Sequence, residues 1–407
     1  MSQNLKKIMI LGGGENQLPL IKKAKELGYI TVVCDYQKDC VGFKHADICH
    51  LVSIKDEEQL LTVAKNEGVL GIVTNSELVL HIVSNLTQQL GLPTVPDKIT
   101  ERFRNKGKMR ECLTPMGLSD VRYRVCHQRE DAVSFFRNIN KHKCIIKPLD
   151  NSSSRGVYSI NNEQDIIDHF DESIGMNRTH AGVLMEEYIS GREFTVDGIC
   201  VNGKHTTLAI SKKKHFDYNE NVANELFFSY QDAEYNYDEL RLLNNQIIEA
   251  AGLNFGLTHA EYKYSNGKYH LIEVAARGGG AFISTDIVPF LTKTDTVGAY
   301  LESAMGLYSN SHIIIPEDSK QRVAVLKFFS TPDNKSGIVK KIIGVDYLET
   351  SPNILRYGLE FSIGDSIHPA TNDGDRIGYY IAIAEDKQEL HNIMEEVERS
   401  FNILFDE

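Results

Sequence analysis

The sequence predicts an α/β protein that continues into α+β segments. Three observations carry this prediction. In the first 95 residues, short apolar runs alternate with amphipathic stretches, which is typical of a parallel sheet covered by helices. From residue 183 onward, strand-like runs follow one another closely and indicate an antiparallel sheet. After residue 320, apolar and turn residues alternate before an amphipathic helix near 386–400.

Composition limits the classes of function. The chain has 407 residues and a formal net charge of −12, and its 42% hydrophobic content supports several globular domains. An acidic chain lacks the basic footprint that binding to a nucleic-acid backbone requires. No apolar run reaches the ~18 residues of a membrane span and the N-terminus has no signal-peptide core, so we expect no membrane partner and a cytoplasmic location. The seven scattered cysteines are expected to be reduced thiols.

The first expected domain covers residues 1–95, and its elements alternate between strand and helix. Their expected ranges are strand 8–11, helix 16–27, strand 30–34, helix 56–66, strand 69–73 and helix 77–90. Gly91, Pro93 and Pro96 then interrupt the pattern, which places a domain boundary near residue 95.

A glycine turn at 12–14 and Asp35 together suggest a dinucleotide site. Glycines let a pyrophosphate approach a helix N-terminus, and an acid at the end of the second strand can bind a ribose. However, Gln17 stands where the motif Gly-x-Gly-x-x-Gly needs its last glycine. A tight strand-to-helix turn is therefore the favoured interpretation.

Further helices and strands follow the boundary near residue 95. Their expected ranges are helix 98–117, strands 121–126 and 143–147, helix 163–174, strands 183–188, 193–201 and 205–211, helix 238–253, strands 258–264 and 269–274, and helix 294–305. The last two strands form a hairpin around Asn266-Gly267. An irregular polar stretch is expected to begin at Lys212.

Two lysines and a small-residue loop form a candidate anion site. Lys106 and Lys147 lie in different elements, and Lys147 ends an apolar strand. A lysine there is either a solvated strand end or a point charge for phosphate oxygens. The loop that follows favours the second interpretation, because successive backbone amides in such a loop form a nest for anions. Its residues include Ser152, Ser153, Ser154 and Gly156.

Carboxylates supply the next candidates. A strand that ends near Glu193 presents a backbone edge for a purine and an acid for a ribose, although an ordinary edge strand with solvated acids explains it equally. Counting inward from the hairpin turn pairs Glu261 with residue 272, so Glu273 is one step out of register. A small bulge would place both glutamates on one face, where a divalent cation such as Mg²⁺ would relieve their repulsion. Otherwise they are surface acids on opposite faces.

Arg277 directly follows, with three glycines after it, and this group suits an oxyanion or a phosphoryl group. Taken in order, these residues point to Mg²⁺ and a nucleoside triphosphate. They resemble the ATP-grasp superfamily of carboxylate-amine ligases, in the branch with biotin carboxylase and the L-amino acid ligases. The resemblance covers nearly the whole chain and implies an ATP-grasp fold. It places a Rossmann-like pre-ATP-grasp domain at 1–95, a two-part ATP-grasp domain at 98–310 with a flexible lid at about 120–190, and a small α+β domain at 320–407.

The resemblance also implies roles for individual residues. Lys106, with Lys108 as the alternative, and Lys147 would bind phosphates under the loop 152–156. Arg277 would act with Lys147 on the transferring phosphoryl group. The remaining cofactor residues would be Glu186, Glu187 and Ile189 at the adenine, Glu193 at the ribose, and Glu261 and Glu273 at Mg²⁺, with Mn²⁺ as an alternative. Ala275 stands where the family motif Glu-x-Asn-x-Arg has asparagine, so the amide for a second metal is absent.

The implied activity is ATP-dependent joining of a small carboxylate to an amine, through an acyl phosphate, with release of ADP and phosphate. A homodimer is compatible with the family. Three alternatives stay open: a bicarbonate-activating carboxylase, a non-catalytic ATP-binding protein, and a dinucleotide-binding oxidoreductase. Related ligases line the acceptor pocket near Lys212–His215 and Glu225, although three successive lysines are more often a solvated surface. His259 shares a strand face with Glu261 and is either active or simply satisfied by hydrogen bonds.

Overall fold

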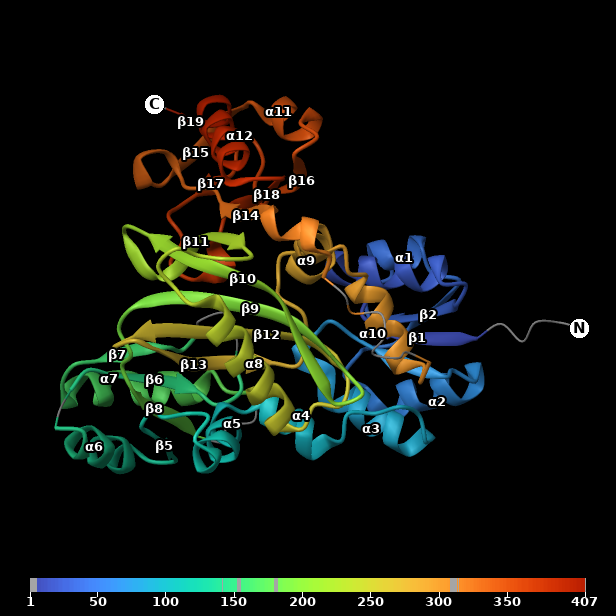
Figure 1. The fold of residues 1–407 in the computed structure, drawn as a ribbon, viewed down its shortest axis with the longest axis horizontal. Coiled ribbons are helices and arrows are strands. Elements are labelled where there is room, and N and C mark those ends of the chain that lie inside the picture. The colour runs from blue at the N-terminus through green and yellow to red at the C-terminus, as the bar shows by residue number, and fades with distance from the viewer. Residues whose placement is uncertain are drawn as a thin grey trace, which may run out of the picture.

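The computed structural model describes residues 6–140, 142–151, 155–178, 182–307, 313 and 315–406. Figure 1 shows an N-terminal unit in blue beside a long mixed body, with the C-terminal segment in red above it. None of the helices in these ranges is long and apolar enough to cross a membrane. The seven cysteines are all free, as expected.

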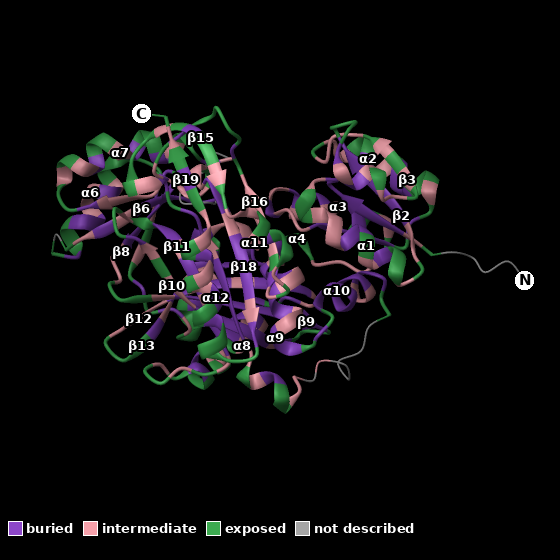
Figure 2. Ribbon diagram, turned by 90° about the horizontal axis from the view of Figure 1, so that it is seen from above, coloured by how far each residue is buried: buried purple, intermediate pink, exposed green. Residues whose placement is uncertain are grey.

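The N-terminal unit is the predicted parallel α/β sheet. Its strands are β1 (Lys7–Leu11), β2 (Ile30–Asp35), β3 (Ile48–Leu51) and β4 (Gly71–Val73), in the spatial order β3-β2-β1-β4. Its helices are α1 (Leu18–Glu26), α2 (Glu57–Glu67) and α3 (Leu80–Leu90). Apolar side chains on both faces of β1 are buried, which explains its unbroken apolar run. Figure 2 shows these buried strands between helices whose outer faces are exposed.

The predicted helix 98–117 is two helices. These are α4 (Asp97–Arg104) and α5 (Lys106–Leu113), which meet at Asn105. The Asn105 side chain accepts a hydrogen bond from the backbone N–H of Lys108 at 3.1 Å and so caps α5. The break places Lys106 in the first turn of α5, where its backbone N–H donates to the Leu149 carbonyl at 2.9 Å.

A small antiparallel sheet follows, in the order β5-β8-β6-β7. Its strands are β5 (Tyr123–Cys126), β6 (Cys144–Pro148), β7 (Tyr158–Ile160) and β8 (Val183–Glu187), and α6 (Arg129–Asn138) and α7 (Glu163–Gly175) pack against it. We expected the strand near 183–188 to share a sheet with the next two strands, and this was wrong. The chain leaves the small sheet after β8 because it turns at Gly191, which has a φ of +130°. A Cβ there would lie 2.0 Å from the Tyr264 carbonyl oxygen.

An eight-stranded sheet forms the centre of the molecule, in the order β13-β12-β9-β10-β11-β14-β18-β16. The strands from the middle of the chain are β9 (Arg192–Val201), β10 (Lys204–Phe216), β11 (Asn219–Ser229), β12 (Gly256–Ser265) and β13 (Lys268–Ala275). Helix α8 (Tyr237–Ala251) packs on β10, and α10 (Thr296–Ala304) connects the sheet to the N-terminal unit.

The C-terminal segment, which we expected as a small α+β unit, adds three strands to this sheet and forms a second small sheet, β17-β15-β19. Strands β14 (Val323–Phe328), β16 (Ile354–Leu359) and β18 (Gly378–Ala384) extend the eight-stranded sheet, because β14 pairs with β11 along its length. The remaining elements are α11 (Val345–Thr350), α12 (Lys387–Ser400) and the short strands β15 (Gly337–Ile343), β17 (Ser366–Ile367) and β19 (Asn402–Phe405). The boundaries near residues 95 and 320 stay predictions.

The polar stretch expected from Lys212 is part of a strand, whose register shifts on either side of His215. Strand β10 runs on to Phe216 and pairs with both β9 and β11. Each lysine of the run has its own carboxylate partner: Lys212 with Asp232 at 2.6 Å, Lys213 with Glu193 at 2.5 Å and Lys214 with Glu225 at 2.7 Å. The run is therefore a strand and not a loop, and only Lys213 is largely shielded from solvent, whereas Lys214 is exposed.

A buried histidine in the sheet predicts pH-dependent stability. His205 lies 2.7 Å from Asn245 and 2.8 Å from Thr258, and its burial lowers its pKa from 6.5 to about 4. Below pH 6.5 the unfolded chain therefore binds a proton that the folded chain refuses, so stability falls by roughly 3 kcal/mol between pH 6.5 and 4. Urea unfolding at pH 7, 5.5 and 4.5 should show this loss in the wild type and a flatter profile in His205→Gln. If the free energy of unfolding depended on pH equally in the two proteins, His205 would not be the source of the loss.

Candidate functional site

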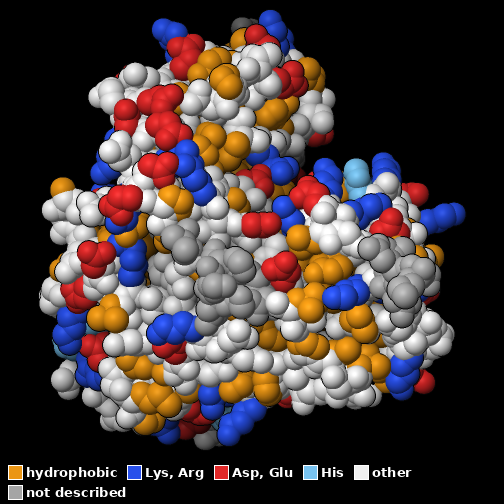
Figure 3. All heavy atoms as spheres, turned by 45° about the vertical axis from the view of Figure 1, so that its right-hand side comes forward, with side chains coloured by type: hydrophobic (Ala, Val, Ile, Leu, Met, Phe, Trp, Pro, Cys, Tyr) orange, Lys and Arg blue, Asp and Glu red, His pale blue; other side chains and the backbone are white. Residues whose placement is uncertain are grey.

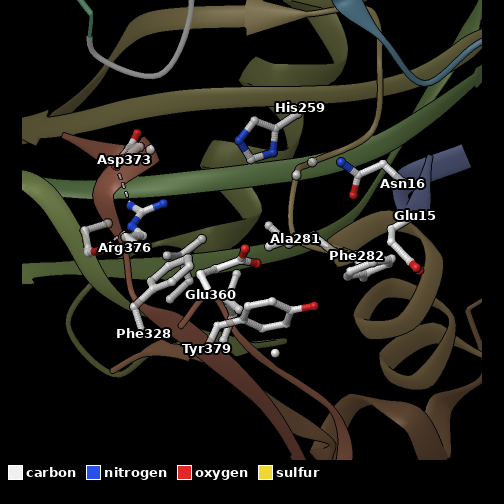
Figure 4. A pocket seen from close by; sticks show the side chains of 18 of the residues that line it. Glu15, Asn16, His259, Ala281, Phe282, Phe328, Glu360, Asp373, Arg376 and Tyr379 are labelled. Atoms are coloured by element: carbon white, nitrogen blue, oxygen red, sulfur yellow. Dashed lines mark hydrogen bonds and ion pairs between the residues drawn. The ribbon is translucent and has the colours of Figure 1, made fainter. Parts of the chain in front are cut away.

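A cavity of about 1220 Å³ lies where the N-terminal unit, the central sheet and the C-terminal strands meet. Figure 3 shows acidic and basic side chains gathered around the junction between the upper lobe and the body. In Figure 4, Glu15 and Asn16 enter from the N-terminal unit and His259 from the central sheet, while Glu360 and Tyr379 enter from the C-terminal segment. Residues far apart in the sequence thus line one space.

Neighbouring strands of the central sheet present a polar face to this cavity. Glu261 on β12 pairs directly with Glu273 on β13, and with Thr195 on β9 at its other side. The register shifts just beyond Glu261, because Tyr262 pairs with Leu271 and leaves Ile272 as an extra residue. The predicted bulge is confirmed, and it is what brings the two glutamates onto one face.

The same bulge connects the glutamates to two cations. Its extra residue, Ile272, presents a carbonyl that accepts hydrogen bonds from Arg110 at 3.3 Å and from Lys147 at 3.5 Å. A regular hairpin would use this carbonyl in the strand pairing. The bulge therefore places Glu261 beside Glu273, and it also frees a carbonyl that accepts a hydrogen bond from Lys147, the expected phosphate ligand.

Glu186 lies buried between Lys147 and Arg110. Its two oxygens lie 2.5 Å from Lys147 Nζ and 2.6 Å from Arg110 Nε, and all three side chains are almost inaccessible to solvent. Burial alone would raise the pKa of Glu186, but the charges of Arg110 and Lys147 lower it to about 2. The Glu186 carboxylate thus positions Lys147, and any contact of this residue with adenine would come from its backbone.

The other residues expected near adenine lie at the end of β8. The Glu187 carboxylate accepts hydrogen bonds from the side chain of Arg122 at 2.7 Å and from its backbone N–H at 2.9 Å. Ile189 lies half-buried in the connection to β9. Ser152, Ser153 and Ser154 fall outside the described residues. Gly156 is described and has a φ of +75°. The adenine and loop assignments stay predictions.

Two lysines contact the expected metal acids. Lys106 Nζ lies 3.2 Å from Glu273 and also donates to the Asn151 carbonyl at 2.7 Å. Lys213 Nζ lies 3.4 Å from Glu261 and 2.5 Å from Glu193, the acid expected at the ribose. Burial disfavours the ionised form of Glu193, yet the charge of Lys213 holds its pKa well below the usual range.

Glu261 and Glu273 fit a magnesium site. Both are carboxylates, and Mg²⁺ is usually held by one or two carboxylates together with phosphate oxygens and waters. Within the described ranges, no group of three or more His, Cys, Asp or Glu side chains is placed to hold a metal ion. The protein thus offers an acid pair whose remaining ligands would come from a nucleotide. Ala275 lies opposite His259 on the same face and supplies no ligand.

Arg277 reaches across to the N-terminal unit. Its guanidinium lies 3.1 Å from the buried Glu77 carboxylate and donates to the Gly278 carbonyl at 2.9 Å. The glycines after it are needed for close contact. A Cβ on Gly278 would lie 1.9 Å from Ser284 Oγ, and one on Gly279 would lie 2.6 Å from Asp197 Oδ1. The loop therefore holds Arg277 at the edge of the cavity.

Asp197 also ties His259 to this loop. Its Oδ1 atom lies 3.0 Å from His259 Nδ1 and accepts the backbone N–H of Gly279 at 3.1 Å. His259 nevertheless lines the cavity. The ring nitrogen Nδ1 of His259 thus has a hydrogen-bond partner, as one of the two interpretations expected. The sequence alone did not identify Asp197 as that partner.

The glycine turn of the N-terminal unit makes hydrogen bonds within the protein, to the Asp35 side chain. Both oxygens of the Asp35 carboxylate accept backbone N–H groups, from Gly13 at 2.7 Å and from Gln37 at 2.8 Å. A Cβ on Gly13 would lie 2.5 Å from Cys40 Sγ. The geometry agrees with a tight turn in which the Asp35 carboxylate fixes the backbone of the turn.

Two side chains of the site, Arg110 and Glu77, were not among the candidates from the sequence, and Lys213 was named only within the stretch 212–215 expected near the acceptor. Arg110 follows Lys106 by one helical turn, which is the spacing that places two residues on one helix face. Glu77 and Lys213 lie 200 and 48 positions from their partners Arg277 and Glu261, so only the folded chain brings them together.

Comparison with known proteins agrees with this geometry. The family model described as "ATP-grasp domain" matches residues 140–286, and that described as "L-amino acid ligase C-terminal domain 2" matches residues 328–404. Dapdiamide A synthase from Enterobacter agglomerans is 24% identical over 239 residues, which are 57% of this chain and 56% of that protein. The alignment therefore spans about half of this relative.

Solved structures resemble the chain over nearly its whole length. An L-amino acid ligase from Bacillus licheniformis superposes with a TM-score of 0.79 at 20% identity and covers 100% of both chains. The biotin carboxylase domain of the 2-oxoglutarate carboxylase from Hydrogenobacter thermophilus, solved with MgADP and bicarbonate, gives 0.75 at 17% identity over 99% of this chain and 91% of that one. The predicted fold class is confirmed. The chain therefore contains an ATP-grasp domain and an L-amino acid ligase C-terminal domain, and over its whole length it shares the fold of the L-amino acid ligase structure.

Proposed function

We propose that this protein uses ATP to join a small carboxylic acid to an amine, forming an amide or peptide bond. The observation that carries the proposal is a cavity lined by Glu261, Glu273 and Arg277, with Lys106 3.2 Å from Glu273. In the proposed reaction the substrate carboxylate attacks the γ-phosphoryl group, and ADP leaves. The amine then attacks the acyl phosphate and releases inorganic phosphate.

The residues would act by positioning and by neutralising charge. Phosphoryl transfer spreads negative charge over the equatorial oxygens, and the ammonium and guanidinium groups of Lys106, Lys147 and Arg277 would stabilise that charge. Glu261 and Glu273 would hold Mg²⁺, which would supply positive charge against the phosphates. Glu77 would orient Arg277, because a carboxylate 3.1 Å from the guanidinium restricts its rotation. Mn²⁺ is proposed as an alternative metal.

Amino acids are the first substrates to test. The relatives named L-amino acid ligase and dapdiamide A synthase support this choice. A bicarbonate-activating reaction is the second candidate, since the fold is also that of a biotin carboxylase domain solved with bicarbonate. We also propose a cytoplasmic location and a homodimer. The second rests on the family and on the dimer described for that carboxylase domain.

The test is ATP turnover with Mg²⁺, followed as ADP and phosphate release while pools of amino acids, other small carboxylates and amines are added. Substrate-dependent ADP release that stops when EDTA removes the metal supports the ligase, and dividing the active pool names the substrates. Release that requires bicarbonate instead supports the carboxylase. Binding of ATP without release from any pool would favour a non-catalytic nucleotide-binding protein.

A further inference from the structure

Lys213 occupies a central position between two acids of different expected roles. Its Nζ lies 2.5 Å from Glu193, expected at the ribose, and 3.4 Å from Glu261, expected at the metal. The imidazole of His215 also approaches Glu193, with Nε2 at 3.5 Å from its carboxylate. Glu193 and Lys213 are largely shielded from solvent, so their charges act on one another strongly.

Strand geometry assigns this position to Lys213 alone among the three lysines of the run. Successive side chains of a strand point to opposite faces. Lys213 therefore faces the cavity, which it lines, while Lys212 and Lys214 pair with Asp232 and Glu225 instead. Substitutions of Lys212 and Lys214 can therefore serve as controls for a substitution of Lys213.

Glu273, the second acid expected at the metal, also has a lysine beside it. Lys106 lies 3.2 Å from Glu273, so each of the two glutamates already contacts an ammonium group. A divalent cation that joins these carboxylates meets the repulsion of both lysines. Phosphates that draw the lysines away would leave partly buried carboxylates without a counter-charge, which is also costly.

Metal and nucleotide relieve these costs when they arrive together. The lysines can then turn to phosphate oxygens while the carboxylates take the cation, so every charge exchanges one partner for another. We propose that Lys213 couples the two binding events, so that the divalent cation binds weakly without nucleotide and tightly with it. This inference rests on the metal site of the proposed function. Because coupling is reciprocal, the cation strengthens nucleotide binding by the same factor.

Mn²⁺ binding followed by electron paramagnetic resonance tests the proposal without any turnover. The full-length protein is titrated with Mn²⁺ alone and again with the non-hydrolysable analogue AMP-PNP. Lys213→Met leaves Glu193 and Glu261 without their ammonium group, so we expect Mn²⁺ alone to bind at least about 10-fold more tightly than in the wild type. The gain from AMP-PNP should shrink in the same variant.

The controls come from the same strand. Lys212→Met and Lys214→Met should leave Mn²⁺ binding unchanged, and Lys213→Arg, which keeps the charge, should behave like the wild type. If Lys213→Met does not fold by circular dichroism, Lys213→Gln takes its place, with the same expected gain. An unchanged or weaker affinity for Mn²⁺ alone in the neutral variant would overturn the coupling role while leaving the ligase proposal intact. Failure of the wild type to bind AMP-PNP with Mn²⁺ would overturn both.

Discussion

Glu273→Gln should reduce substrate-dependent ADP formation by about 10²–10³-fold, the usual cost of losing one group that stabilises transition-state charge. Glutamine keeps the size of the side chain but removes the negative charge that we assign to the metal. It also removes the ionic partner of Lys106, 3.2 Å away. The measurement is a coupled ADP assay at saturating ATP with increasing Mg²⁺.

Glu239→Gln is the matched control, because Glu239 is an exposed acid in the first turn of α8. It should retain wild-type turnover. Full activity of Glu273→Gln at ordinary Mg²⁺ concentrations would remove Glu273 from the metal site. Activity restored only at high Mg²⁺ would instead support it.

Arg110→Met should lower the free energy of unfolding by about 3–5 kcal/mol, the cost of removing one partner from a buried ion pair. Arg110 has no exposed surface and donates to Glu186 at 2.6 Å and to Ser119 at 3.0 Å. Methionine fills much of the space but leaves Glu186 with Lys147 as its only cation. Urea denaturation at pH 7 measures the effect.

Arg122→Met provides the comparison, since Arg122 binds the adjacent Glu187 at 2.7 Å on the exposed side of the strand. An exposed pair contributes about 1 kcal/mol or less. Similar losses in the two variants would show that burial does not strengthen the interaction of Arg110 with Glu186.

The order of chemistry-bearing residues could be predicted because it is a property of the chain. The apolar run that leads to Lys147, the strand that begins beside Glu193 and the hairpin turn at Asn266-Gly267 are local patterns that survive folding. Counting from the turn placed Glu261 opposite residue 272, so the sequence left the choice between a bulge and opposite faces open, and the folded hairpin has the bulge. The sheet to which each strand belongs was not predictable in the same way. The crossing at Gly191 depends on a close approach to the backbone of Tyr264.

The sequence by itself thus determined the family of folds, the acid pair and the lysine and arginine expected around phosphate. Tertiary structure decided which charges neutralise which. Lys213 looked like part of a solvated run until strand pairing brought it to Glu193, and Glu77 had no role until its unit met Arg277. The physical reason is that an ion pair depends on a distance of a few ångströms between side chains far apart in the chain, and only the packed sheet sets that distance.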